Sequence, residues 1–481
     1  MTQTVIEQTN VKDNNYDLIV IGAGAGGLTA SGFAGQMGAK VALVEREYLG
    51  GDCTWTGCIP SKALIKVANT AHTVRIANKY GIMTTNPTVD MTKVRNYIQQ
   101  TIQDVYQHET PEEFSKRGVD IIHGEAQFVD ANTIEINGQR LHAKKFVIAT
   151  GAKPLLPPIK GLTDVPFMTN REIFDNDVLP ERMLIIGAGP IGMEMAQAYA
   201  RLGSHVTLVD VQMLPRDEPE AQTVIKQVFE REGIQFVESL VSEIAREGDE
   251  IVATLQNGAT VRADMVFVAT GRKPNVNSVG LDNAGVSYSE MGIKVDKFLR
   301  TNQSHIYAVG DCIGAPYFTH NASYQGAQAA RNALIPGNTV GVLDTLPWVT
   351  FTSPEIAHAG MTEVEAREKY GDAVKTFMFH NKQGDRTITE DDVDGFIKLV
   401  YKGSGKLLGA TIVSERAGEM ITELIIAMKF NISPMKLTLA IHPYPTYSEV
   451  VQRAMLEVVV KELFDGFSGK VINGFSKVMY S

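Results

Sequence analysis

The chain has 481 residues, of which 44% are hydrophobic and 21% charged, and 45 basic against 55 acidic residues give a formal net charge of −10. A chain of this length is too long to fold around a single hydrophobic core, so it is predicted to form several domains. The acidic balance argues against a nucleic acid or an anionic membrane as partner, and no apolar run approaches the ~20 residues that span a bilayer. Residues 1–15 are polar and lack the apolar core of a signal peptide, so we expect a disordered arm and a cytoplasmic protein.

The first predicted element after this arm is a nucleotide-binding βαβ unit. An apolar strand over residues 16–21 leads into a glycine turn, a helix of small residues covers 28–37, and a second strand over 40–44 ends in Glu45. The turn has the pattern G-x-G-x-x-G, with glycines at Gly22, Gly24 and Gly27. The first permits a tight turn, the second lets the backbone approach a pyrophosphate, and the third lets helix and strand pack closely. The helix N-terminus attracts phosphate, and Glu45 is placed to bind a ribose hydroxyl.

A cysteine pair follows directly. The chain has only 3 cysteines, and Cys53 and Cys58 lie in the run GDCTWTGCIPSK. So few cysteines argue against a disulfide scaffold and for a reducing compartment, where a close pair is typically catalytic. Residues five apart in a regular helix are separated by about 7.5 Å along its axis, whereas a disulfide joins Cα atoms about 5.5–6 Å apart. Closing the pair therefore requires a distorted turn, which Gly57 and Pro60 favour. The alternative is two unrelated buried cysteines.

The glycine pattern recurs further along the chain. An apolar strand over 182–186 precedes a second turn, a helix that contains Glu194 follows, and a strand over 205–209 ends in Asp210. The glycines of this turn are Gly187, Gly189 and Gly192. Two dinucleotide sites in one chain indicate electron transfer between two nucleotide cofactors. Asp210 favours a free ribose 2′-hydroxyl, and therefore NAD over NADP. No arginine follows it directly, which supports this choice, although Arg216, which is further off, could still reach a 2′-phosphate.

Other apolar strands also end in turns with residues suited to ligand binding, because ligands gather at the carboxyl ends of parallel strands. We assign to this edge Thr150, Gly151, Gly271 and Asp311. An ordinary boundary between strand and turn is the alternative for each. Cys312, next to Asp311, is expected to be a buried bystander, with contact to substrate as the alternative. Neither a CxxC nor an HExxH motif occurs, so no resident metal is predicted.

The pattern of predicted elements changes after about residue 346. Strands over 396–401 and 407–413 flank a glycine-rich turn and are predicted to form a hairpin. Helices are expected over 417–430 and 447–464. The apolar stripe on the last helix suits either a core or a subunit interface, and we favour an interface.

In the order of these motifs, from residue 17 to 449, the chain resembles the FAD-dependent pyridine nucleotide–disulfide oxidoreductases, which include dihydrolipoamide dehydrogenase, glutathione reductase and mercuric reductase. The resemblance implies an α/β fold with two Rossmann-like domains, which bind FAD and NAD(P), and a C-terminal α+β dimerisation domain. The implied segments are an arm at 1–15, an FAD-binding domain at 16–150, an NAD(P)-binding domain at 151–273, a return to the FAD domain at 274–345 and the dimerisation domain at 346–481.

The resemblance also implies roles for the nucleotide-binding residues. The first glycine turn and Glu45 would bind the ADP half of FAD, and Asp311 would hold its ribityl chain. Gly50 and Gly51 would approach the pyrophosphate. The second glycine turn and Asp210 would bind NAD, with NADP as the alternative.

For the chemistry, the resemblance makes Cys58 the thiolate beside the flavin and Cys53 the thiol that exchanges with substrate. Lys62 lies four residues after Cys58, on the same helix face, and would lie beside the flavin and pair with Glu194. Electrons would pass from NADH to FAD, then through Cys58 to the disulfide, and from the dithiol to a small-molecule acceptor.

The C-terminal run departs from the family pattern His-Pro-Thr-x-x-Glu, in which a histidine oriented by a glutamate is the acid/base. Here Tyr444 occupies the histidine position, His442 lies two residues earlier, and Glu449 matches the glutamate. Tyrosine, with a pKa of about 10, is a poor base near neutrality. In the family this run completes the partner's active site, so we expect a homodimer.

The tyrosine, together with Trp55 between the cysteines, resembles the mercuric reductase branch, but the C-terminal cysteine pair that captures the metal is lacking. We therefore expect reduction of a disulfide-like or soft-metal acceptor. Dihydrolipoamide dehydrogenase with His442 as base is the first alternative. A diaphorase or quinone reductase that bypasses the cysteines is another, and a flavoprotein that has lost its disulfide chemistry is the last.

Overall fold

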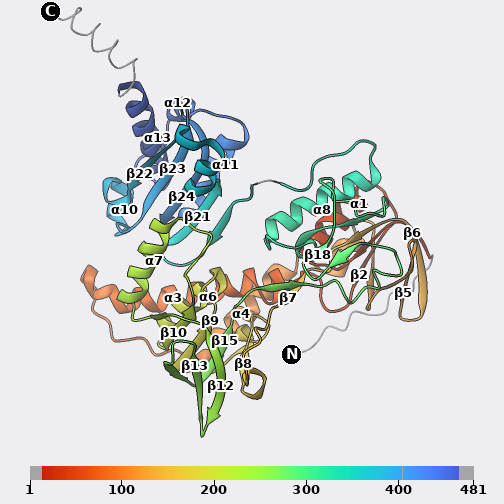
Figure 1. Cartoon of the computed structure of the whole chain (residues 1–481), viewed down its shortest axis with the longest axis horizontal. Coiled ribbons are helices and arrows are strands. Elements are labelled where there is room, and N and C mark those ends of the chain that lie inside the picture. Colours follow the sequence, from red (N-terminus) through yellow and green to blue (C-terminus); the bar gives the residue numbers. More distant parts are fainter. Residues whose placement is uncertain (1–13, 344, 404, 465–481) are drawn as a thin grey trace, which may run out of the picture. The chain divides into compact units, whose positions relative to one another are not determined.

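The computed structural model describes residues 14–343, 345–403 and 405–464, so residues 1–13 of the expected arm lie outside the described residues. The backbone forms two compact units, each made from several segments of the chain (Figure 1). The first unit comprises the described residues of Met1–Gly187, Ala198–Val209 and Ser239–Asp344. The second comprises those of Ala188–Gln197, Asp210–Glu238 and Thr345–Ser481. None of the described helices is long and apolar enough to cross a membrane.

A seven-stranded sheet forms the centre of the first unit. Its strands in spatial order are β3 (Val119–His123), β2 (Val41–Glu45), β1 (Asn15–Ile21), β6 (Gln139–Ile148), β5 (Thr133–Ile136) and β4 (Gln127–Asp130), with β19 (Ile306–Ala308) also paired to β6. The strands β3, β2, β1, β6 and β19 run parallel. Parallel strands are covered on both faces and are therefore almost continuously apolar. The helices α1 (Ala25–Gln36) and α8 (Thr319–Leu334) pack together against this sheet (Figure 1).

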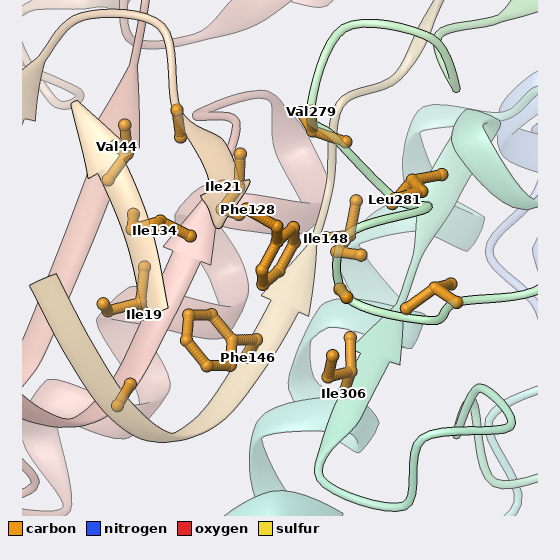
Figure 2. Close-up of a cluster of buried hydrophobic side chains, with 14 of the residues drawn as sticks. Ile19, Ile21, Val44, Phe128, Ile134, Phe146, Ile148, Val279, Leu281 and Ile306 are labelled. Carbon is orange, nitrogen blue, oxygen red and sulfur yellow. The ribbon is translucent and has the colours of Figure 1, made fainter. Parts of the chain in front are cut away.

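The core of this sheet also binds the chain segment that returns after the second glycine motif. Phe128 and Phe146 are fully buried and meet edge to face, with ring centroids 5.1 Å apart. Figure 2 shows Val279 and Leu281 beside Ile148 in the same cluster. Burying side chains of this size stabilises the fold by roughly 1.5–3 kcal/mol each. The packing therefore fixes β19, and with it the turn that carries Asp311, against the first sheet.

Four further parallel strands of the first unit carry the second glycine motif. They are β10 (His205–Asp210), β9 (Arg182–Ile186), β15 (Met265–Val268) and β8 (Phe167–Met168) in spatial order. The helix α6 (Pro190–Leu202) begins directly after the second glycine turn. The predicted strand at 182–186 is confirmed, and the next one extends one residue further than expected, to Asp210.

The second unit contains an antiparallel sheet. Its strands in spatial order are β20 (Trp348–Thr350), β21 (Glu355–Gly360), β24 (Lys406–Ser414), β23 (Phe396–Lys402) and β22 (Val374–His380). The strands β23 and β24 pair as the predicted hairpin. The two predicted helices are α11 (Ala417–Lys429) and α13 (Tyr447–Phe464), and their apolar faces enter the core of this unit. The buried stripe of α13 therefore packs at least partly in the core, where we had favoured an interface.

A buried lysine stands in the middle of this apolar sheet. Lys398 on β23 is 4% exposed, and its Nζ lies 3.0 Å from Glu218, 2.7 Å from Glu220 and 2.9 Å from Glu363. The glutamates come from the start of α7 (Pro219–Arg231) and from α9 (Glu363–Tyr370). These bonds raise the pKa of Lys398 and outweigh the opposite effect of burial. A buried charge needs such partners, and the ion cluster therefore joins three segments that are far apart in sequence.

The other elements of the described residues complete the two units. The α-helices among them are α2 (Gly51–Trp55), α3 (Cys58–Ile76), α4 (Met91–Tyr106), α5 (Pro111–Ser115), α10 (Asp385–Thr389) and α12 (Pro434–Thr438). The remaining strands are β7 (Ala152–Pro154), β11 (Gln235–Glu238), β12 (Val241–Glu247), β13 (Glu250–Leu255), β14 (Thr260–Ala263), β16 (Arg272–Pro274), β17 (Tyr288–Ser289) and β18 (Gly292–Ile293). Of these, β7 and β16 pair with each other. This pairing joins the segment before the second glycine motif to the segment that follows it.

Candidate active site

The cysteine pair spans a break between two helices. Cys53 lies in α2 (Gly51–Trp55), and Cys58 begins α3 (Cys58–Ile76). A Cβ at Gly57, between them, would lie 2.6 Å from the carbonyl oxygen of Asp52, so only glycine fits there without a shift of the backbone. The distorted turn that we expected is thus an interruption of the helix, and it brings the side chains of Cys53 and Cys58 into hydrogen-bonding contact.

The surroundings of Cys53 favour its protonated thiol. The contact with Cys58, burial and the carboxylate of Glu109 all raise the pKa of Cys53, whereas the hydroxyl of Thr319 lowers it. The Oγ1 of Thr319, at the start of α8, lies 3.3 Å from the Sγ of Cys58.

An aromatic cluster holds the loop in front of the pair. The rings of Tyr48 and Tyr106 both pack against Trp55 in tilted arrangements, each with its centroid 5.0 Å from that of the tryptophan. Its Nε1–H donates to the carbonyl oxygen of Leu49 at 2.7 Å. The tryptophan therefore closes the loop that contains Gly50 and fixes it to α2, a role that its position between the cysteines did not reveal.

Polar side chains hold the loop between the cysteines. Asn170 donates to the carbonyl oxygen of Thr56 at 3.0 Å. The hydroxyl of Thr54 donates to Glu109 Oε2 at 2.7 Å. Each contact satisfies a backbone or side-chain group beside Cys53 with a residue more than 50 positions away in sequence. The pair is consequently held by tertiary contacts as well as by its own helices.

A buried arginine connects the cysteine helix with the turn at Asp311. Arg272, whose side chain is 16% exposed, forms an ion pair with Asp52, and its Nε lies 3.2 Å from Asp311 Oδ2. Its Nη2 also donates to the carbonyl oxygen of Ala152 at 2.9 Å. Burial raises the pKa of Asp311, Arg272 lowers it, and Asp52 raises it. Two carboxylates therefore share one guanidinium directly beside the cysteine pair.

The first glycine turn forms a close-packed backbone cradle. Gly22 has φ +100°, and a Cβ on it would lie 2.4 Å from the carbonyl oxygen of Ala149. A Cβ on Gly27 would lie 1.8 Å from the carbonyl oxygen of Gly22, and one on Gly51 would lie 2.7 Å from the Cα of Gly24. A Cβ on Gly24 itself would meet nothing within 4 Å. The turn thus leaves room above its second glycine, next to the N-terminus of α1, where a pyrophosphate fits.

In each glycine motif, the acidic residue at the end of the second strand forms a hydrogen bond to the glycine turn. Glu45 Oε2 accepts from the backbone N–H of Ala23 at 2.7 Å. Asp210 Oδ2 accepts from the N–H of Ala188 at the same distance. Both carboxylates retain acceptor capacity for a ribose. In the second turn, a Cβ on Gly189 would again meet nothing within 4 Å. The acids therefore have a structural role in addition to the predicted one.

The other strand-end residues are held by mutual hydrogen bonds. Thr150 Oγ1 donates to the carbonyl oxygen of Asn275 at 2.8 Å, and the Asn275 amide donates back to Thr150 O at 2.9 Å. The N–H of Asn275 binds Gly151 O at 2.9 Å. Gly271 O accepts from the N–H of Leu155 at 3.0 Å. These residues join the paired passages β7 and β16, and their contact with a cofactor remains a prediction.

Lys62 and Glu194 lie in different units of the structure. Lys62 lies four residues after Cys58 on α3, and its Nζ donates to Ser61 Oγ at 3.3 Å. Glu194 is 6% exposed and accepts from the backbone N–H of Phe351 at 3.0 Å. The expected pairing of Lys62 with Glu194 therefore stays a prediction.

In the C-terminal run, His442 is bound on both sides. Its Nδ1 lies 2.8 Å from the carbonyl oxygen of Ala440, and its Nε2 lies 2.8 Å from Glu423 Oε1. Both ring nitrogens are therefore engaged with oxygen atoms of neighbouring residues.

Tyr444 and Glu449 have different partners in this structure. Tyr444 is 69% exposed, and its hydroxyl donates to Asp385 Oδ2 at 3.1 Å, which raises the pKa of the phenol. Glu449 Oε1 lies 3.8 Å from Arg453, and its Oε2 is buried with no hydrogen-bond partner in the part of the chain that the structure describes. At the position where the family pattern has a histidine, this chain therefore has an exposed phenol, and its part in catalysis remains a prediction.

Comparison with known proteins agrees with this geometry. The pyridine nucleotide-disulphide oxidoreductase family matches residues 16–326, and the dimerisation domain of pyridine nucleotide-disulphide oxidoreductases matches residues 346–455. The chain belongs to this family. The α/β fold that the sequence predicted, with FAD- and NAD-binding parts and a dimerisation domain, is confirmed.

Three relatives illustrate the range of the family. A mercuric reductase from Lysinibacillus sphaericus is 35% identical over 454 residues, which cover 93% of this chain and 83% of that protein. A dihydrolipoyl dehydrogenase from Thermus scotoductus is 34% identical over 452 residues, 91% of this chain and 96% of that protein. The solved structure of the Cu(II) complex of the HOCl-induced flavoprotein disulfide reductase RclA from Escherichia coli has a TM-score of 0.82 at 25% identity and covers 91% of this chain and 98% of that one.

Members of the pyridine nucleotide-disulphide oxidoreductase family use FAD and NAD(P)H, and this chain is an NAD(P)H-dependent flavin oxidoreductase. The cradle above Gly24 fits the pyrophosphate of a dinucleotide, since a side chain there would fill the space that the phosphates need. The dimerisation domain is the part through which members of this family form homodimers.

Several residues around the pair escaped sequence reasoning. Asp52 lies in the cysteine run and Arg272 directly follows Gly271, and in both cases the charge itself was the available signal. Glu109, Asn170 and Thr319 carry no local pattern that connects them with the cysteines. Cys312 is fully buried, and burial raises the pKa of its thiol to about 11, in agreement with the bystander interpretation.

Proposed function

We propose that this oxidoreductase relays two electrons from NADH through FAD to the Cys53–Cys58 pair and from there to a disulfide-like or soft-metal acceptor. The observation that carries the proposal is the contact between the two cysteines across a helix break that only glycine allows. FAD, when bound, supplies the two-electron carrier between the nicotinamide and the sulfurs. The first glycine turn with Glu45 and the second with Asp210 are proposed to hold the two nucleotides.

The residues of the chain then have complementary tasks. Cys53, which exchanges with the acceptor, attacks as the thiolate, and Cys58 resolves the mixed disulfide. The Thr319 hydroxyl, 3.3 Å from Cys58 Sγ, stabilises the negative charge on that sulfur. Lys62, one helical turn after Cys58, adds positive charge on the same side. We further propose that the C-terminal run of a partner subunit completes the site, and that Asp311 orients the ribityl chain.

The acceptor is proposed to resemble that of the mercuric reductase branch. Tyr444 in place of a histidine supports this, because a soft metal ion needs thiolate ligands and no proton donor for a departing thiol. We expect rapid NADH oxidation with Hg(II) or Cu(II) and slow oxidation with oxidised glutathione or lipoamide. The measurement is the loss of NADH absorbance under anaerobic conditions with each acceptor. Equal rates with metal and disulfide acceptors would contradict the assignment to this branch.

Dihydrolipoamide dehydrogenase activity is the second candidate, favoured by the 34% identical dihydrolipoyl dehydrogenase. It would require His442 as base. The two acceptors that bind both ring nitrogens of His442 oppose that role. Fast reduction of NAD by dihydrolipoamide that is lost in His442→Gln would establish this candidate instead.

NADH is proposed as the electron donor because Asp210, at the end of β10, offers a carboxylate where NADPH carries a phosphate. Repulsion between the two should lower kcat/KM for NADPH by about 10-fold or more relative to NADH. Asp210→Asn should reduce this preference while its side-chain oxygen still binds the N–H of Ala188. Steady-state rates with the two donors test the prediction, and a wild-type preference for NADPH would refute it.

A further inference from the structure

Resting on the proposed function, we infer that Glu109 gives the exchange cysteine a preference for cationic and neutral acceptors over anionic ones. Glu109 follows α4 by three residues and lies beside the cysteine helix. Its Oε2 accepts from the hydroxyl of Thr54, the residue directly after Cys53, at 2.7 Å. A Cβ on Gly50 would lie 2.6 Å from the same oxygen. The carboxylate is thus held over the first turn of α2.

The position of Glu109 is fixed from both ends. Its backbone N–H binds the carbonyl oxygen of Tyr106 at 2.8 Å, and the Tyr106 ring belongs to the cluster around Trp55. The side chain is partly buried, so its charge is less screened by solvent than that of an exposed glutamate. The carboxylate is one of the groups that raise the pKa of Cys53.

The other charges around the pair do not cancel this field. Asp52, directly before Cys53, and Asp311 share the single guanidinium of Arg272. Lys62 follows Cys58 on α3, on the side of the resolving cysteine. Counting these side chains with Glu109, three carboxylates face two cations. Because Glu109 is bonded to the residue directly after Cys53, its charge lies beside the cysteine that is proposed to meet the acceptor.

This charge acts on each step of disulfide reduction. The Cys53 thiolate attacks one sulfur of an acceptor R–S–S–R, which forms a mixed disulfide and releases one thiolate RS⁻. The Cys58 thiolate then attacks Cys53 Sγ, which forms the Cys53–Cys58 disulfide and releases the second RS⁻. Both thiolates take up protons from solvent, and the two electrons come from the reduced pair, which NADH regenerates through FAD. An anionic R group brings further negative charge to Glu109 in the encounter and in the mixed disulfide.

Three disulfides of similar size test the inference: cystamine, a dication, hydroxyethyl disulfide, which is neutral, and dithiodipropionate, a dianion. We expect kcat/KM of the FAD-loaded enzyme to fall in that order. In Glu109→Gln, which keeps an acceptor for Thr54, the ratio between cystamine and dithiodipropionate should decrease about threefold to tenfold. Glu113→Gln is the matched control, because that carboxylate forms an exposed pair with Lys116, and its ratio should equal that of wild type.

Salt provides a measurement that needs no variant. If Glu109→Gln does not fold, a cystamine-to-dithiodipropionate ratio in wild type that shrinks as ionic strength rises supports the inference, and a ratio that is constant with salt overturns it. An unchanged ratio in folded Glu109→Gln, or a wild-type preference for the dianion, also overturns it. Absence of NADH oxidation with all three disulfides is a different result, because it refutes the proposed disulfide chemistry itself.

Discussion

Replacing Cys58 by serine is expected to lower acceptor-dependent NADH oxidation at least about 1000-fold, because the variant can neither receive electrons at that sulfur nor resolve a mixed disulfide on Cys53. FAD binding should persist, since the glycine cradle and Glu45 are unchanged. Titration of reactive thiols before and after anaerobic NADH gives a second measurement. Wild type should expose two additional thiols after reduction, and Cys58→Ser should expose none.

Cys312→Ser is the matched control for this experiment. Its thiol is fully buried and bonds to the carbonyl oxygens of Val309 and Ile148, so its loss should leave the thiol difference at two and turnover close to that of wild type. Disulfide or metal reduction that survived in Cys58→Ser would contradict the relay. It would instead indicate a diaphorase that transfers electrons without the cysteine pair.

Replacing Lys398 by methionine should destabilise the second unit by about 3–5 kcal/mol, the usual effect of removing one partner from a buried ion cluster. Methionine fills most of the volume of the lysine stem, but it leaves Glu218, whose side chain is 1% exposed, with buried negative charge and no cation. The thermal unfolding midpoint, followed by fluorescence at constant protein and FAD concentration, should fall by several degrees.

Lys375→Met is the matched control, because it removes a positive charge from an exposed position and not from a buried one. Lys375 lies on the neighbouring strand β22, is 52% exposed, and binds Glu462 at 2.7 Å. Exposed pairs of this kind contribute roughly 0–1 kcal/mol, so this variant should unfold close to wild type. Equal midpoints for the two variants would show that the Lys398 cluster contributes no more than a surface pair.

The elements that the sequence predicted share one property: their signals are local. The strand at 182–186, the hairpin and the helices at 417–430 and 447–464 were placed within one or two residues, because apolar runs and glycine turns adjoin in sequence. The helix after the first glycine turn begins at Ala25 rather than at 28, since its first turn contains glycines that weaken a helical pattern. The cysteine pair was likewise legible from its spacing.

The features that the sequence did not predict depend on contacts between residues that are far apart in sequence. Thr319 reaches Cys58 across 261 positions, and Arg272 reaches Asp52 across 220. Lys398 interrupts an apolar strand, and no pattern near it in the sequence indicates which glutamates form ion pairs with it. Such pairs are determined by how the sheets and helices pack, and single-sequence patterns carry no record of that packing.

The matching bonds from Glu45 to Ala23 and from Asp210 to Ala188 limit how the nucleotide preferences of this enzyme can evolve. Each acid spans 22 positions and ties the turn of its own motif. If Asp210 sets the donor preference as proposed, a change that removes its charge must also leave an acceptor for the N–H of Ala188. Asparagine meets both conditions, whereas a residue without a side-chain oxygen would release the turn and weaken the binding of either donor.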